Sequence, residues 1–274
     1  MKPTGTPIAW WGRLWFGVEV FFGVSAVVTI ALDPANARTN FAWNVQPTVM
    51  AAVLGAFYVS SALLFLLPFF ARRWEMIRVM ILPTALFCAA ELAATFLHWS
   101  KFSLGTAPFI VWFLSYLLPP PIFVALYWLQ ERRLRRRASA AVATEPLLAV
   151  ARLALLFWGG LLAAIAVFFF VAPQALIAIA PWPMTPLTAR ALVAWLLMAG
   201  ALMLSMAREN DRTRVLLGVP MLLLMFPMVT IQIARFAGQV NFANIALFAG
   251  LGITAVAFVL GVYLALGNWR QALG

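Results

Sequence analysis

Residues 49–70 read VMAAVLGAFYVSSALLFLLPFF and contain no charged side chain. A helix of this length extends about 33 Å at 1.5 Å per residue, which is enough to cross the hydrocarbon core of a bilayer. Lipid offers no hydrogen bonds to an unpaired backbone, and a membrane barrel needs an alternation of polar and apolar residues that is absent here. The stretch therefore predicts a transmembrane helix.

Seven further apolar runs of similar length extend this prediction to the whole chain. Of the 274 residues, 65% are hydrophobic and 10% are charged, and the mean hydropathy is +0.98. An average soluble domain is about half apolar and a quarter charged. We therefore predict an all-α membrane protein of eight transmembrane helices. The other runs lie near residues 14–32, 79–97, 108–129, 153–171, 189–207, 215–234 and 242–266.

The basic residues between these runs predict the orientation of the chain. Of the 19 Lys and Arg residues, only Arg38, Lys101, Arg190 and Arg235 fall on one side of the predicted turns, and the others fall on the opposite side. Loops rich in Lys and Arg stay in the cytoplasm. We therefore expect both ends of the chain to be cytoplasmic and the protein to be a multi-pass protein of the bacterial cytoplasmic (inner) membrane.

The most basic segment, ERRLRRRASAAVATEP, begins at Glu131. We predict a cytoplasmic linker over residues 131–149, in which the arginines from Arg132 to Arg137 touch anionic lipid headgroups. The net charge of +11 then reflects topology, and we expect no nucleic-acid partner because aromatic residues do not interleave the arginines. A homo-oligomer or another membrane protein remains open as a partner.

The beginning of the chain has a second interpretation. A basic segment, an apolar run and Ala35-Asn36-Ala37 together resemble a cleavable signal peptide. A retained helix is favoured because the run is long for a signal core, contains Glu19 and has a counterpart later in the chain.

That counterpart belongs to an internal repeat. Arg13-Leu14 recurs 139 residues later as Arg152-Leu153, and Arg78-Val79 recurs 136 residues later as Arg214-Val215. Trp43 and Pro47 likewise recur as Trp182 and Pro186. We predict a first four-helix repeat over residues 1–130 and a second over residues 150–274. Because each repeat has an even number of crossings, the two would be parallel and related by an axis along the membrane normal.

Two glutamates fall inside predicted membrane helices, where a charge is costly and polar groups usually mark function. We estimate that Glu19 and Glu91 differ in depth by about 10 Å, which argues against a direct pair. Each glutamate is a candidate for solute or proton binding. For Glu91 a structural role, in which its carboxyl group is neutral or paired with an arginine, is about equally compatible with the sequence. Neither has a carboxylate counterpart in the other repeat, so a site around them would be asymmetric.

The remaining candidates lie toward the predicted outer side. Arg190 begins the sixth helix, where the helix dipole disfavours a cation, so we expect compensation by Glu91, Asp33 or an anionic ligand. His98 lies two turns beyond Glu91 and is either its surface partner or a headgroup anchor. Arg235 and Gln232 share one face of the seventh helix, where the dipole favours a cation.

Backbone and aromatic patterns add further expectations. Pro119, Pro120 and Pro121 interrupt the fourth helix, and broken helices build substrate sites in many transporters. A kink that serves only packing is the alternative. Tryptophans, Trp43 and Trp182 among them, are expected in interfacial belts, and the glycines 159, 160, 250 and 252 at close helix contacts.

The sequence contains few of the residues and motifs that catalysis requires. It has one cysteine, Cys88, and one histidine, so we expect no disulfide, no metal site and no cofactor. No nucleophile or phosphate-binding motif is present, although catalysis on a lipid-soluble substrate stays open. We expect a permease-like protein for a small or amphiphilic solute, coupled through an intramembrane carboxylate. The alternatives are a non-catalytic accessory or sensing subunit and an intramembrane enzyme.

One segment carries a family resemblance. FAWNVQPTVMAAVLGAFY, residues 41–58, resembles a stretch of uncharacterised multi-pass bacterial membrane proteins in which Phe-Ala-Trp and a proline lead into an Ala/Gly-rich helix. The likeness implies a membrane fold and no particular activity.

Overall fold

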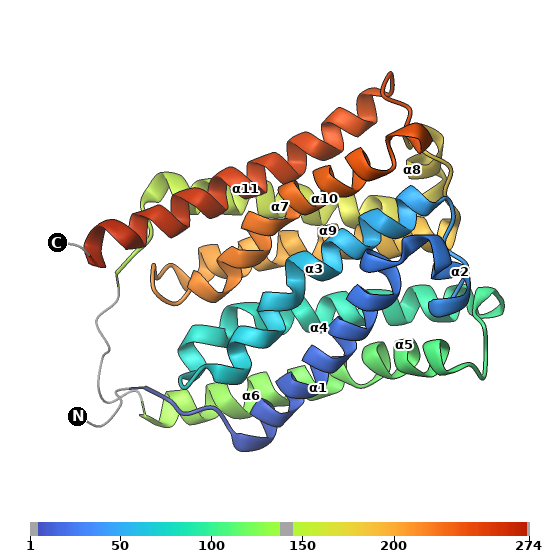
Figure 1. The fold of residues 1–274 in the computed structure, drawn as a ribbon. Coiled ribbons are helices and arrows are strands. Elements are labelled where there is room, and N and C mark those ends of the chain that lie inside the picture. Colours follow the sequence, from blue (N-terminus) through green and yellow to red (C-terminus); the bar gives the residue numbers. More distant parts are fainter. Residues whose placement is uncertain (1–4, 138–144, 273–274) are drawn as a thin grey trace.

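The computed structural model describes residues 5–137 and 145–272. Within these ranges every regular element is helical, and eight helices are long and apolar enough to cross a membrane (Figure 1). Six of these spans are single helices: α3 (Thr48–Phe70), α4 (Trp74–Leu97), α7 (Ala149–Val171), α9 (Pro186–Glu209), α10 (Val219–Arg235) and α11 (Ile245–Ala272). The multi-pass α-helical fold expected from hydropathy is thereby confirmed.

The other two spans are composite. The first joins α1 (Trp10–Ala26) to η1 (Val27–Leu32), which consists of wider π-helical turns, and the fourth joins α5 (Ala107–Leu117) to α6 (Pro119–Arg137). Short helices lie in the connections: η2 (Pro34–Asn36), α2 (Ala37–Asn40), η3 (Trp99–Lys101), α8 (Pro173–Ile179), η4 (Leu216–Gly218) and η5 (Ala237–Gln239).

Both ends of the described chain lie at one end of the bundle. The start of α1 and the end of α11 both lie there, and we call it the terminal end (Figure 1). The short helices α2 and α8 lie at the opposite end, which we call the far end. An even number of crossings requires this arrangement, whichever side of the membrane the terminal end faces.

The eight spans form a central group and a peripheral group. The helices α3, α4, α9 and α10 are central, with α3 packed on α10 and α4 packed on α9. Each central helix carries one peripheral partner, so α1 packs on α3, α6 on α4, α7 on α9 and α11 on α10. The peripheral helices expose large apolar side chains, for example Phe21 on α1 and Phe157 on α7. Such a surface suits a lipid environment.

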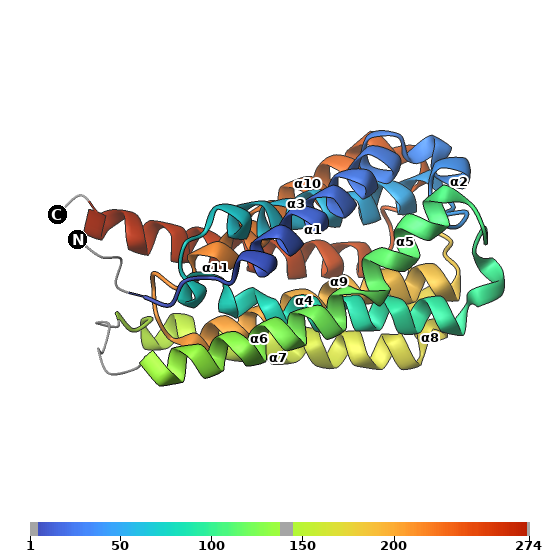
Figure 2. The same ribbon diagram turned by 90° about the horizontal axis from the view of Figure 1, so that it is seen from below.

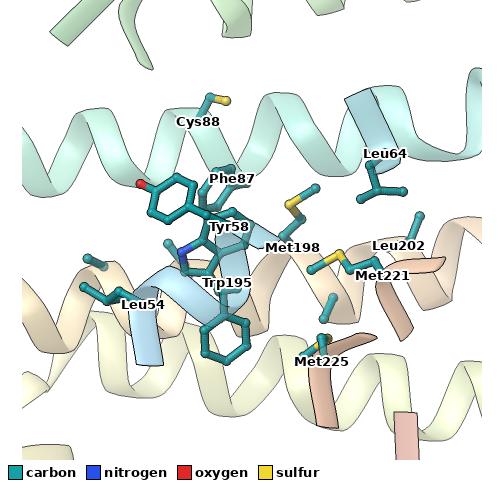
Figure 3. Close-up of a cluster of buried hydrophobic side chains, with 14 of the residues drawn as sticks. Leu54, Tyr58, Leu64, Phe87, Cys88, Trp195, Met198, Leu202, Met221 and Met225 are labelled. Carbon is teal, nitrogen blue, oxygen red and sulfur yellow. The ribbon is translucent and has the colours of Figure 1, made fainter. Parts of the chain in front are cut away.

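The centre of the bundle is filled by aromatic and sulfur-containing side chains. Trp195 of α9 lies against Phe87 of α4 and Tyr58 of α3, with ring centroids 4.1 and 4.9 Å away (Figure 3). Beside them lie Met198, Met221 and Met225, together with Leu64 and Leu202 (Figure 3). Flexible methionine side chains fill irregular gaps between helices, and here they join helices from both halves of the chain.

Glycine allows the α7–α9 pair to approach closely. A Cβ added to Gly159 of α7 would lie 2.9 Å from the carbonyl oxygen of Gly200 on α9, and one on Gly200 would meet the α7 backbone at 2.8 Å. Gly160, Gly250 and Gly252 have open space where a Cβ would stand. The predicted close contact is therefore correct for Gly159 and wrong for the other three.

A network of charges closes the terminal end. Arg78 of α4 donates Nε and Nη2 to the two carboxylate oxygens of Glu209 on α9, at 2.6 and 2.7 Å. Arg214 also binds Glu209, at 3.1 Å, and Arg78 reaches Glu131 at 3.5 Å. The arginines of the two Arg-Val motifs thus share one carboxylate, which links the halves of the chain.

Two sequence expectations change in detail. Trp43 and Trp182 are buried, with 2% and 7% of their surfaces exposed, so the prediction that they belong to interfacial belts is wrong. Trp43 instead packs edge-on against Phe102 and Trp112. The basic segment begins as the last turns of α6, which ends at Arg137, and residues 138–144 of the expected linker lie outside the described residues.

The Gly159 contact can be tested against its neighbour. Replacing Gly159 by Leu should destabilise the protein by about 1–3 kcal/mol, because the added atoms must push α7 and α9 apart. The matched change Gly160→Leu places the same side chain in open space, and we expect no loss because Leu favours helix more than Gly does. Thermal unfolding in detergent measures both variants. Equal melting temperatures for the two would contradict the packing described here.

Candidate functional site

A half-open cavity of about 260 Å³ lies in the first half of the chain. Its walls come from α1 and η1 on one side, α5 on the other, and α3 and α4 behind, and it extends to Asn40, Phe41 and Pro108 at the far end. Trp195 of α9 is the one wall residue from the second half of the chain among those described. Glu19 lines it near the middle of the first span.

The broken fourth span places the α5 wall. The chain bends at Leu118, and Figure 2 shows α5 leaving the direction of α6. Proline cannot donate the amide hydrogen bond of a continuous helix, and its ring crowds the preceding turn. Pro119, Pro120 and Pro121 therefore account for the break that the sequence predicted. The cavity lies beside α5, whose residues Val111, Trp112, Ser115 and Tyr116 face it.

Glu19 is the acidic group of this cavity. Its side chain is buried, with 4% of the residue exposed, and its Oε1 has no hydrogen-bond partner in the described structure. The indole of Trp15, one turn earlier on α1, interacts with the carboxyl, although its N–H does not reach hydrogen-bond geometry with any acceptor. One carboxyl oxygen of this cavity-lining residue is thus buried with its bonding capacity unused.

Opposite Glu19 stands an aromatic wall that the sequence analysis missed. The hydroxyls of Tyr58 and Tyr116 share a hydrogen bond of 2.6 Å, and both side chains are buried. Trp112 packs on Tyr116 with centroids 4.3 Å apart and on Phe41 at 5.4 Å. These residues come from α3, α5 and the loop after α2, so only the fold assembles them. The chain contains only four tyrosines, and this scarcity was the one feature of the sequence that could have drawn attention to Tyr58 and Tyr116.

Glu91 lies outside the lining of the cavity and is fully buried on α4. Neither carboxyl oxygen has a hydrogen-bond partner among the described residues. The group lies within electrostatic range of Tyr58, Tyr116 and Cys88, and Cys88 is also within range of Glu19. The structure thus brings both predicted carboxyls to the neighbourhood of Cys88 without joining them.

Arg190 finds a different partner from the one expected. Its Nη1 donates to Nε2 of His98 at 2.7 Å, and its Nε donates to the carbonyl of Phe170, in the last turn of α7, at 2.9 Å. A direct pair between Glu91 and Arg190 is not formed. The negative end of the α7 dipole supplies the compensation that was expected from Glu91, Asp33 or an anionic ligand.

The other candidates lie at the far end and serve local structure. Asp33 accepts hydrogen bonds from the amides of Asn36 and Asn40, at 3.1 and 3.3 Å. Arg235 donates to Gln232 at 2.7 Å and to the carbonyl of Ala31, at the end of the first span, at 3.3 Å. Asn40 lines the cavity, so the Asp33 cluster borders its far end.

The second half of the chain contains a larger cavity of about 390 Å³. It lies among α7, α8, α9, α10 and α11, and Val53 and Phe57 of α3 also line it. Thr254 is the one described residue in its lining with a polar side chain other than tryptophan. At the position that corresponds to Glu19 by the repeat spacing, α7 carries Trp158. The two halves therefore differ in chemistry, and the acidic cavity is confined to the first.

The fold and the cavity define a multi-pass helical membrane protein with an acidic, aromatic site inside one half. No protein-family model matches the chain, and neither a curated protein nor a solved structure matches it. Among the described residues, no three His, Cys, Asp or Glu side chains gather in a group that could hold a metal ion.

The His98–Arg190 contact predicts a pH dependence of stability. Burial, followed by the charges of Arg190 and Lys101, lowers the pKa of His98 below its ordinary value of 6.5. The folded protein therefore binds this proton less readily than the unfolded chain, and stability should fall as the pH drops through 6.5. Protonation also removes the acceptor for Arg190 and places two cations together.

His98→Gln supplies the matched control, because glutamine keeps a hydrogen-bond acceptor and does not titrate. Melting temperatures measured from pH 7.5 to 5.5 should fall further in the wild-type protein than in this variant. Parallel curves for the two proteins would show that His98 does not titrate against folding.

Proposed function

We propose that this protein is a permease-like carrier that binds a small amphiphilic solute in the cavity of its first half, with Glu19 as the binding carboxylate. The observation that carries the proposal is the unpartnered, buried Oε1 of Glu19, a residue that lines the cavity. An ionisable group in a membrane helix is expensive, and it is usually found where a solute or a proton passes.

The chemistry of the cavity supports an amphiphilic solute. Beside Glu19 and the Tyr58–Tyr116 pair, its wall carries hydroxyls from Ser25, Thr29 and Ser115 together with aromatic rings. Ligand sites commonly combine an apolar wall with a few polar groups that fix orientation. A groove that only accommodates lipid tails has no need of the carboxylate.

An internal repeat would supply the two similar units that a carrier of this kind needs. Arg13 donates to the carbonyl of Ala71 at 2.8 Å, and Arg152 donates to the carbonyl of Ala207 at 3.2 Å. These four residues correspond at the repeat spacings of 139 and 136 residues. The helix contacts correspond as well: α1 on α3 matches α7 on α9, and α3 on α10 matches α9 on α4. This agreement supports two parallel four-helix repeats.

The contacts between these halves suit a movement of one half against the other. At the terminal end they are joined by Arg78 and Glu209, and at the far end by His98 and Arg190. Carriers built from repeats expose a central site alternately by rocking such units. Opening the far end requires the His98–Arg190 contact to separate, whereas opening the terminal end requires the Arg78–Glu209 pair to do so.

We place the terminal end in the cytoplasm of a bacterial cell, on the basis of its many arginines. Arg132 stacks on Trp128 of α6, with its guanidinium carbon 3.3 Å from the ring centroid. This pair near the end of α6 is placed to meet anionic headgroups.

Thiol labelling of intact cells tests the orientation. In a Cys88→Ala background, Gly238→Cys at the far end should react with a membrane-impermeant maleimide added outside. Ala140→Cys in the basic segment should react only after the membrane is permeabilised. The reverse pattern would overturn the orientation.

Thiol labelling also tests the carrier function against its alternatives. Thr29→Cys places a thiol in the cavity, and Val28→Cys places one beside it on the exposed apolar face of η1. A solute site that water reaches should let a charged, impermeant thiol reagent modify position 29 and leave position 28 unmodified. If neither residue reacts from either side of the membrane, the cavity is closed to water, and an accessory role would be favoured.

A further inference from the structure

The charges around the cavity narrow the class of solute, and this step rests on the proposed function. The titratable groups that face Glu19 or its neighbours are Cys88 and Glu91 of α4, Tyr58 of α3 and Tyr116 of α5. None of the described residues that line the cavity is Lys, Arg or His. Of the candidate cations from the sequence analysis, Arg190 is bound to His98 and Phe170, and Arg235 is bound to Gln232 and Ala31. An anionic solute would therefore meet only acidic and neutral groups.

The aromatic wall favours the opposite charge. The rings of Phe41, Trp112 and Tyr116 lie in contact along one side of the cavity, and Phe87 and Trp195 continue them inward (Figure 3). The face of an aromatic ring carries partial negative charge and attracts cations, most strongly away from water. A carboxyl group and several aromatic residues around one cavity are groups that would favour an organic cation.

The burial of Glu19 also limits which groups can neutralise its carboxyl group. An ionised carboxyl without a partner is costly inside a membrane protein, so the group must be neutralised by a proton or by a bound cation. The described structure supplies no basic partner, which leaves the proton as the resident neutralising group when the cavity contains no solute. A cation and this proton then compete for the same oxygen atoms.

We infer that the cavity binds a compact organic cation with an aromatic or aliphatic body, and that binding displaces the proton of Glu19. The exchange balances: the neutral carboxylic acid and the cation give a carboxylate–cation pair and one proton, which leaves to water. No oxidant or other reactant is needed. A carrier of this kind would exchange one proton for one monovalent cation.

The size of the cavity limits the cation. Drug-sized ligands occupy pockets of about 300–1,000 Å³, and this cavity, at about 260 Å³, accepts one ring with a small ammonium group. Benzyltrimethylammonium meets this limit, and its charge does not depend on pH. Neopentylbenzene has the same shape without the charge, because carbon replaces the nitrogen. Comparing the binding of the two probes separates the effect of charge from the effect of shape.

The test measures binding and proton release together, with purified protein in detergent at low buffer concentration and a pH indicator. Benzyltrimethylammonium should bind more tightly than neopentylbenzene and should release up to one proton for each cation bound. Glu19→Gln should weaken cation binding by at least about 30-fold and abolish proton release. It should leave neopentylbenzene binding unchanged, which also shows that the variant is folded. Glu19→Asp should retain proton release.

The outcomes separate this inference from the proposed function. If neopentylbenzene binds as well as the cation does, or if Glu19→Gln leaves cation binding and proton release unchanged, cation–proton exchange is wrong while the solute cavity stands. If neither probe binds to folded wild-type protein at millimolar concentration, the cation site and the solute cavity both fail.

Discussion

Hydrocarbon cannot form hydrogen bonds, and this constraint organises the whole protein. The helices satisfy their own backbones except at their ends, where the last carbonyls of each helix lack partners. Arginines from neighbouring helices fill this need: Arg13 binds Ala71, Arg152 binds Ala207, Arg190 binds Phe170 and Arg235 binds Ala31. Each arginine places its charge at the negative end of a helix dipole, so one interaction stabilises the charge and the helix end together.

Against this background the unpartnered carboxyls are the exception. Glu19 and Glu91 are buried with carboxyl oxygens that lack hydrogen-bond partners, whereas the buried Glu75 and Asp211 accept hydrogen bonds, and Glu19 also borders a cavity. The corresponding region of the second half is apolar, with Trp158 at the position equivalent to Glu19. In the carrier that we propose, one half of the chain would carry the chemistry, while the other half supplies packing and the wall residue Trp195.

Sequence reasoning found the candidate groups more readily than their partners. Arg190 needs compensation because it begins a helix, and this argument holds although the partners are His98 and a carbonyl rather than Glu91. A backbone carbonyl at the end of another helix leaves no mark in the sequence. Trp43 looked like an interfacial residue for the same reason, since only the fold brings Phe102 and Trp112 against it.

The sequence by itself determined the helices, because the length of an apolar run and the cost of unpaired backbone in lipid depend on local composition alone. It also determined where the fourth span breaks, since Pro119, Pro120 and Pro121 remove amide donors wherever the helix lies. Only the tertiary structure decided that the break lies beside a cavity, and that Glu19, Tyr58 and Tyr116 share it. These residues lie on different helices, and contacts between helices depend on how side chains interlock over long sequence separations, which no local pattern records.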